Sequence, residues 1–154
     1  MEQTVVLIRH GEAKNKAAGQ TAFERARTDA GAAALRAHFP RALSLVDATD
    51  KSELWASTAL RARQTADIAN ETLGIQEYRE LECMYAQDQA AFLKQLALSC
   101  ADVVVAVGHI PFMEDMCARL CGQYLGFSTG AAAAVRISDT GRGRLLWFVQ
   151  GPQA

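Results

Sequence analysis

The chain has 154 residues, half of them hydrophobic, and a formal net charge of −1. This length predicts a single domain over residues 1–154 with enough apolar side chains for a sizeable core. A near-neutral chain has no general affinity for polyanions, so we expect no nucleic-acid binding, and any phosphate site must depend on a local cluster of cations. The sequence shows neither a secretory signal nor an apolar stretch of membrane-spanning length, which predicts no membrane association.

Four cysteines are present, and none of them belongs to a Cys-x-x-Cys pair. We expect them to be small buried hydrophobes in a soluble, cytoplasmic protein. A metal site made by Cys117, Cys121 and His109 is the alternative, but no second Cys/His pair with ligand spacing supports it. We therefore expect no metal and no cofactor.

The first part of the chain predicts a strand, a loop and a helix. Residues 4–8 are a continuous β-branched and apolar run, typical of a strand buried on both faces. Arg9-His10-Gly11-Glu12 follows directly, and residues 13–27 are polar and indicate a loop. Thr28 is a suitable N-cap for an Ala-rich helix, which we expect Pro40 to end.

A second strand and helix follow. Residues 53–56 predict a short strand. We expect Ser57 or Thr58 to cap the next helix and Gly74 to end it. Residues 75–87 indicate a connection that carries several acidic residues.

The last part of the chain continues the alternation of helices and strands. Residues 88–98 predict a helix, residues 102–107 a second buried strand, and Pro111 opens another helix. Residues 131–137 and 144–149 predict two strands joined by a tight turn. The whole pattern predicts an α/β fold of three layers, α/β/α, with helices on both faces of a largely parallel central sheet.

Two of the predicted strands end in histidine. His10 follows the first strand, and His109 follows the Val-rich strand. In an open α/β sheet, ligands bind beyond the carboxyl ends of the strands, so neighbouring parallel strands would bring both imidazoles to one edge. Arg9 accompanies His10, and Arg61 lies in the first turns of a helix that follows a strand. This set predicts an anion site that contains a nucleophile.

These side chains suit phosphoryl transfer. A neutral imidazole is nucleophilic near pH 7, and guanidinium groups bind phosphate oxygens and stay charged. A protonated His109 adds a third cation, and Gly11 lets the backbone approach a phosphate closely. A lone Arg-His-Gly triplet often occurs by chance, so the interpretation depends on both histidines following strands. His38 lies inside a predicted helix, and we interpret it as structural or solvated.

The ordered motifs resemble those of the histidine phosphatase superfamily, also called the phosphoglycerate mutase-like family. Residues 9–12 resemble its Arg-His-Gly hallmark, and residues 57–65 resemble its Ser-x-x-x-Arg-Ala-x-Gln-Thr segment. Residues 107–111 resemble the segment with the second histidine, and residues 25–31 resemble a segment that opens a helix near the site. Gly-His-Ile-Pro-Phe, together with residues 127–131, is most similar to the small bacterial phosphohistidine phosphatases.

The resemblance implies a phosphoglycerate mutase-like fold and a role for each matching residue. His10 is then the nucleophile, and Arg9, Arg61 and His109 form the phosphate pocket. Gly11 lies against the phosphate, and Arg25 reaches the substrate side. The role of Arg25 stays open, because alanine and arginine follow it where the family has proline and an apolar residue.

The resemblance leaves the general acid undecided. Glu82 and Tyr85 match the Glu-x-x-Tyr spacing of the mutase branch, whereas Glu80 fits the short phosphatases better. The small phosphohistidine phosphatases manage without a dedicated acid, because a protonated imidazole is a good leaving group. An alkoxide leaving group needs a positioned acid. Glu80, Glu82 or neither therefore serves as the acid.

Three functions follow from this interpretation. The first is a phosphatase that acts on protein phosphohistidine through a covalent phosphohistidine on His10. The second is a phosphatase of the same family whose partner is a small phosphorylated metabolite. The third is a non-catalytic protein that binds phosphate or a phosphopeptide. The sequence leaves the oligomeric state open.

Overall fold

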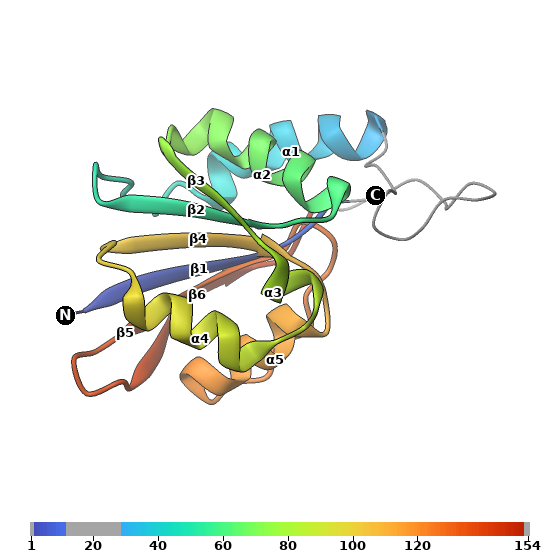
Figure 1. The fold of residues 1–154 in the computed structure, drawn as a ribbon. Coiled ribbons are helices and arrows are strands. Elements are labelled where there is room, and N and C mark those ends of the chain that lie inside the picture. Colours follow the sequence, from blue (N-terminus) through green and yellow to red (C-terminus); the bar gives the residue numbers. More distant parts are fainter. Residues whose placement is uncertain (1, 12–28, 153–154) are drawn as a thin grey trace.

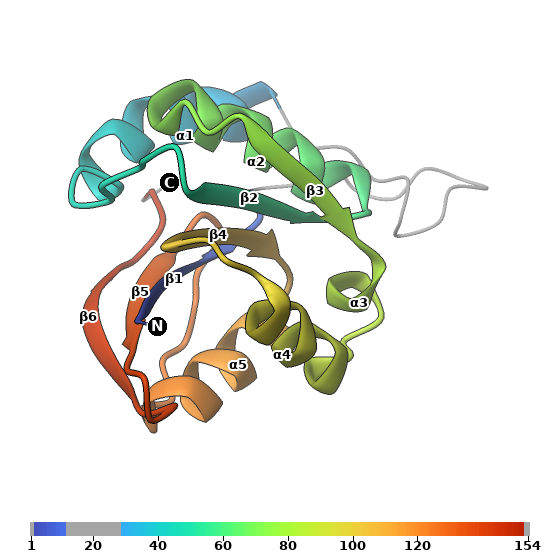
Figure 2. The same cartoon turned by 60° about the vertical axis from the view of Figure 1, so that its left-hand side comes forward.

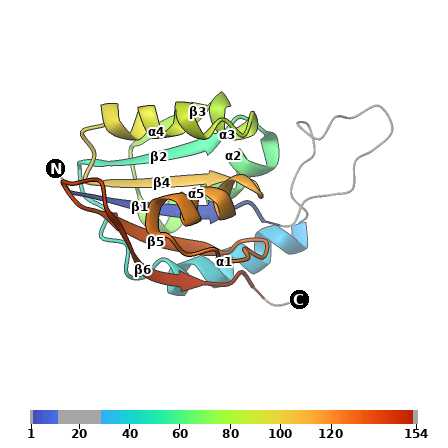
Figure 3. The same cartoon turned by 90° about the horizontal axis from the view of Figure 1, so that it is seen from below.

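The computed structural model describes residues 2–11 and 29–152, and a six-stranded sheet runs through them in the order β3-β2-β4-β1-β5-β6. The strands are β1 (Gln3–Arg9), β2 (Ser52–Ser57), β3 (Glu77–Leu81), β4 (Val103–Gly108), β5 (Ala132–Ile137) and β6 (Gly143–Val149). The helices are α1 (Asp29–Ala42), α2 (Leu60–Leu73), α3 (Glu82–Tyr85), α4 (Gln89–Leu98) and α5 (Phe112–Cys121). The neighbours β3, β2, β4 and β1 are parallel, whereas β5 runs antiparallel to both β1 and β6 (Figure 3).

Helices cover both faces of the sheet. Helices α1 and α2 lie on one face, and α3, α4 and α5 lie on the other (Figures 1 and 2). Two apolar clusters fill the spaces between these layers. One includes Leu35 and Phe39 of α1, and the other includes Phe92 of α4 and Phe112 of α5. The predicted three-layer α/β/α fold with a largely parallel sheet is confirmed.

The two central strands carry the site. Residues 5–8 of β1 and 104–107 of β4 are fully buried, as their apolar runs predict for strands with helices on both faces. The two strands pair in parallel, and Arg9 lies opposite Gly108. The next residue on each strand is a histidine, so the register places His10 and His109 at the same edge of the sheet.

The structure corrects three details of the local prediction. Pro40 lies inside α1 and does not end it. The proline ring removes one backbone donor from the helix, but the burial of the neighbouring Phe39 keeps this last turn packed on the sheet. Residues 75–87 contain β3 and α3. Strand β3 lies at an edge and buries little beyond Leu81, so it lacks the apolar run that marks an internal strand.

The turn between the last two strands is confirmed, with Gly141 at a φ of 84°. The predicted loop 13–27 and the Thr28 cap lie outside the described residues. Within residues 2–11 and 29–152, none of the helices combines the length and the apolar character that crossing a membrane requires.

Candidate active site

Two buried imidazoles meet beyond the carboxyl ends of β1 and β4. His10 and His109 are 7% and 5% exposed. Their ring centroids are 5.3 Å apart, and the rings are inclined at 59°. Both side chains therefore lie at the edge of the sheet where ligands of α/β proteins bind.

Arg61 lies between the two rings. It belongs to the first turn of α2 and is 7% exposed. Its Nε lies 3.3 Å from Nε2 of His10, and its Nη2 lies 3.3 Å from Nδ1 of His109. The buried guanidinium places a positive charge between the two imidazoles, and this charge favours an oxyanion.

The hydrogen bonds of His10 determine which nitrogen carries the lone pair. A guanidinium only donates, so Nε2 of His10 accepts from Arg61. The hydrogen then lies on Nδ1, which donates to the carbonyl oxygen of Gly11 at 2.7 Å. This arrangement fixes the ring in one neutral tautomer and leaves Nε2 as the nucleophilic nitrogen.

The same argument makes His109 neutral when it contacts Arg61. Its Nδ1 accepts from the guanidinium, so Nε2 carries the hydrogen and donates to Oγ of Ser57 at 2.6 Å. Ser57 is fully buried at the end of β2. The ring of Tyr85 packs edge-on against His109, with centroids 5.8 Å apart.

The two residues expected to cap α2 are used in the site instead. The helix begins after Ala59 without a side-chain cap. Ser57 holds His109, and the hydroxyl of Thr58 donates to Oε2 of Glu82 at 2.7 Å. The predicted cap is therefore wrong, because contacts with distant residues outweigh local capping.

Gly11 is required by packing as well as by its place beside His10. Its N–H donates to Oγ1 of Thr65 at 3.0 Å, and that hydroxyl donates to the carbonyl of Arg61. A Cβ at this position would lie 2.5 Å from Cδ1 of Leu35, which is itself buried. Any side chain at residue 11 would displace the core of α1.

Arg9 is held at the border of the site. Its Nη1 donates to the carbonyl of Phe127 at 2.7 Å. Its Nε is buried and has no hydrogen-bond partner among the described residues. Burial lowers the pKa of Arg9, and the charge of Glu114 opposes that shift. A buried donor of this kind is suited to an anionic ligand.

The two candidate acids differ in their contacts, although both are exposed. Glu82 begins α3 and accepts the hydrogen bond from Thr58, the residue next to Ser57. Glu80 ends near Arg63 of α2, with Oε1 and Nε 3.7 Å apart. Glu82 is thus linked to the support of His109, whereas Glu80 pairs with a surface cation.

The structure brings together most of the predicted site. His10, Arg61, His109 and Gly11 share direct contacts or one intervening residue, and Arg9 lies beside them. Arg25 lies outside the described residues. The sequence analysis gave no place in the site to the supports of this cluster, which are Ser57, expected there as a helix cap, Thr65 and the Phe127 carbonyl. The first two belong to the motif of residues 57–65, whereas a backbone carbonyl leaves no signal in a sequence.

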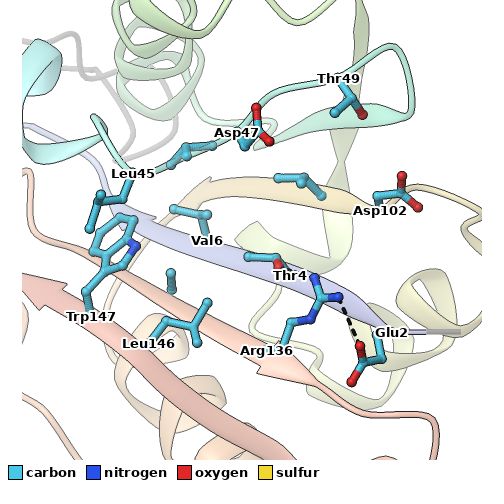
Figure 4. Close-up of a pocket in the computed structure, with 13 residues that line it drawn as sticks. Glu2, Thr4, Val6, Leu45, Asp47, Thr49, Asp102, Arg136, Leu146 and Trp147 are labelled. Carbon is cyan, nitrogen blue, oxygen red and sulfur yellow. Dashed lines mark hydrogen bonds and ion pairs between the residues drawn. The ribbon is translucent and has the colours of Figure 1, made fainter.

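A separate cavity lies at the opposite, amino end of the strands (Figure 4). Its volume is about 420 Å³, and it lies between the starts of β1 and β4, the end of β5 and the connection before β2. Its polar lining includes Glu2, Asp47, Asp102 and Arg136, and it contains no histidine or cysteine. Among the described residues, no group of three His, Cys, Asp or Glu side chains is arranged to hold a metal ion.

The fold and the site together define a class of protein: α/β proteins with two histidines and a buried arginine clustered at the carboxyl edge of the sheet. No family model and no curated protein matches the sequence. Solved structures do match. The putative phosphohistidine phosphatase SixA from Agrobacterium tumefaciens is 28% identical, with 96% of this chain and 97% of that chain covered and a TM-score of 0.81.

Two further structures support the assignment of the fold. The protein histidine phosphatase SixA complexed with tungstate is 24% identical, with 96% of this chain and 97% of that chain covered and a TM-score of 0.79. A mycobacterial glucosyl-3-phosphoglycerate phosphatase is 14% identical, with 99% of this chain and 100% of that chain covered and a TM-score of 0.71. These structural neighbours support the histidine phosphatase superfamily, as the motifs of the chain indicate.

Proposed function

We propose that this protein is a phosphatase that hydrolyses protein phosphohistidine through a phosphohistidine intermediate on His10. The observation that carries the proposal is the lone pair of His10 Nε2, directed at the buried guanidinium of Arg61, 3.3 Å away. A phosphate oxygen that accepts the Arg61 N–H in place of His10 would free this lone pair and place phosphorus close to it. The similarity to the SixA from Agrobacterium tumefaciens supports this substrate class.

The reaction has two displacement steps. In the first, Nε2 of His10 forms a bond to phosphorus, and the bond between phosphorus and the substrate's imidazole nitrogen breaks. The substrate ring, protonated on its other nitrogen, takes the electron pair and leaves as neutral imidazole, so it needs no further acid. In the second, water attacks phosphorus, the bond to Nε2 breaks with its electron pair returning to that nitrogen, and the protons of the water leave on the product, dihydrogen phosphate.

The remaining site residues bind the phosphoryl oxygens. Arg61 and Arg9 donate from fixed guanidinium groups, which favour the charge of the transition state. His109 contributes as a donor once its Nδ1 is protonated and its bond with Arg61 is replaced by one with phosphate. Gly11 fixes Nδ1–H of His10 through its carbonyl. We assign Arg25 to the substrate side on its motif alone.

A second candidate substrate is a small phosphorylated metabolite. The bond between Thr58 and Glu82 favours it, because this bond holds a carboxyl group next to Ser57, the support of His109. A phosphomonoester leaves as an alkoxide and needs such an acid. Glu82→Gln should then lower phosphomonoester hydrolysis roughly a hundredfold and leave phosphohistidine hydrolysis unchanged. Equal rates of the variant and the wild type on both substrates would remove Glu82 from the mechanism, and Glu80→Gln is the matched control.

The main test compares a phosphohistidine peptide with a panel of small phosphomonoesters and traps the enzyme during turnover. We expect acid-labile, base-stable phosphate on the chain and a preference for the phosphohistidine peptide. Preference for a phosphomonoester would favour the second candidate. Phosphate binding without turnover of any substrate would indicate a non-catalytic binding protein and overturn the proposal.

A further inference from the structure

One acidic side chain organises the connection between α5 and β5. Glu114 lies in the first turn of α5, the helix that begins three residues after His109. Its Oε2 accepts the backbone N–H of Phe127 at 2.8 Å, and its Oε1 accepts the hydroxyl of Tyr124 at 3.1 Å. One carboxylate thus fixes two points of the segment that runs from residue 122 to residue 131.

That segment in turn holds the end of β1. The carbonyl of Phe127 accepts from Nη1 of Arg9 at 2.7 Å. The N–H of Gly130 lies 3.1 Å and 3.2 Å from the carbonyls of Arg9 and His10, and the N–H of Arg9 donates to Ala131 at 3.0 Å. The position of the Arg9 guanidinium therefore depends on where the Phe127 peptide group lies.

The negative charge of Glu114 attracts the Arg9 guanidinium, and its hydrogen bond to Phe127 also helps to hold that guanidinium. Its attraction raises the pKa of Arg9 and so opposes the effect of burial. Arg9 and Glu114 therefore interact in two ways. Their opposite charges attract each other, and the backbone of Phe127 bridges them. The N–H of Phe127 donates to the carboxylate, and its carbonyl accepts from the guanidinium.

The segment has other supports, so loss of Glu114 need not unfold it. The side chain of Gln150 accepts from the N–H and the hydroxyl of Ser128 and donates to the carbonyl of Gly126. The ring of Phe127 is 3% exposed and packs against Phe148, with centroids 5.3 Å apart. Removal of the carboxylate would leave the segment in place, but the N–H of Phe127 would lose its acceptor, and the backbone at Phe127 would shift relative to Arg9.

We propose that Glu114 is a positioning residue that aims the Arg9 guanidinium at the bound phosphoryl group through the Phe127 peptide. The proposal rests on the proposed function, because it gives Arg9 an oxyanion to bind. Among the described contacts, Glu114 binds Tyr124 and Phe127 and neither histidine of the pair. Its effect on the reaction is therefore indirect.

The test uses the full chain, four variants and one matched control, with kcat, KM and the inhibition constant of inorganic phosphate as readouts. Glu114→Ala should lower kcat/KM and weaken phosphate inhibition, each by roughly tenfold to a hundredfold, as for loss of a part-buried hydrogen-bonded support. Glu114→Gln should stay within about threefold of the wild type, because its amide oxygen still accepts the Phe127 N–H. Arg9→Ala should mask the change, so that the Arg9→Ala/Glu114→Ala double variant matches Arg9→Ala.

The matched control is Asp115→Ala, which removes the neighbouring acid from the same turn of α5. Equal losses for Asp115→Ala and Glu114→Ala, or additive losses with Arg9→Ala, would overturn the proposal. Calorimetric titration with inorganic phosphate separates this result from the proposed function. If the wild type hydrolyses nothing, weaker phosphate binding by Glu114→Ala alone still supports positioning, and phosphate affinity that is absent or unchanged by the substitution overturns it.

Discussion

The two ends of the same strands use arginine in opposite ways. At the amino end, Arg136 is part-exposed, and its guanidinium contacts the carboxylate of Glu2 at 3.1 Å and the hydroxyl of Thr4 at 2.9 Å (Figure 4). At the carboxyl end, Arg61 is buried and contacts two imidazoles. The first guanidinium is neutralised by a carboxylate in water, whereas the second contributes positive charge where little solvent screens it.

This difference explains why a cavity alone does not identify the active site. The amino-end cavity has ample volume, but its arginine is paired with a carboxylate and its lining contains no histidine or cysteine. The carboxyl end combines a lone pair, a buried cation and strand ends that fix both. Substitutions at the carboxyl end should therefore change the reaction, and substitutions at the amino end should change only stability.

The largest effect should come from His10→Ala. Removal of the nucleophile should lower kcat roughly a thousandfold or more, with the circular dichroism spectrum and the melting temperature little changed. Steady-state kinetics and phosphate trapping on the same preparation measure this. Near-normal turnover by the variant, or labelling that persists without His10, would contradict the nucleophile assignment.

Arg61→Ala should rank second. Loss of one fixed cation should remove about 2–4 kcal/mol of transition-state stabilisation, measured as the change in kcat/KM. Arg61→Lys is the control, because it keeps the charge without the fork that reaches both rings, and it should recover only part of the loss. An unchanged kcat in Arg61→Ala would rule out this role.

Two serines of β2 give a smaller and more selective pair of effects. Ser57 lies at the carboxyl end and binds His109, and Ser52 lies at the amino end and accepts the N–H of Thr49 at 2.8 Å. Ser57→Ala should lower transition-state stabilisation, measured through kcat/KM, by about 1–2 kcal/mol. It should also shift the pH profile of kcat/KM, because His109 loses its fixed tautomer. Ser52→Ala should lower the free energy of unfolding by a similar amount with normal kinetics. Identical kinetic losses in the two variants would show a general effect of destabilisation.

The smallest effect should come from Arg136→Ala at the amino end. An exposed ion pair contributes less than about 1 kcal/mol to the free energy of unfolding, and this one lies away from the histidine pair. Urea denaturation should show a small loss, and kcat and KM should stay at their wild-type values. A marked fall in kcat would mean that the two ends of the sheet are coupled.

The sequence by itself determined the central strands and the histidines that lie at their ends. Apolar runs at residues 4–8 and 102–107 specify strands buried on both faces, because only a strand in a helix-covered sheet accepts such runs. His10 directly follows the last residue of β1, and His109 directly follows Gly108, the last residue of β4. The sequence therefore places both imidazoles at the carboxyl ends of these strands. The order of the motifs was enough to indicate the superfamily.

Only the tertiary structure decided how these residues work together. Local sequence carries no record of the β1–β4 register, of Arg61 inserted between the rings, or of the Phe127 carbonyl behind Arg9. The same holds for Ser57, which local rules assign to a helix cap and which packing assigns to His109. Hydrophobic patterning is a property of neighbouring residues, whereas hydrogen-bond partners far apart in the chain are selected when the layers pack and buried polar groups must find partners.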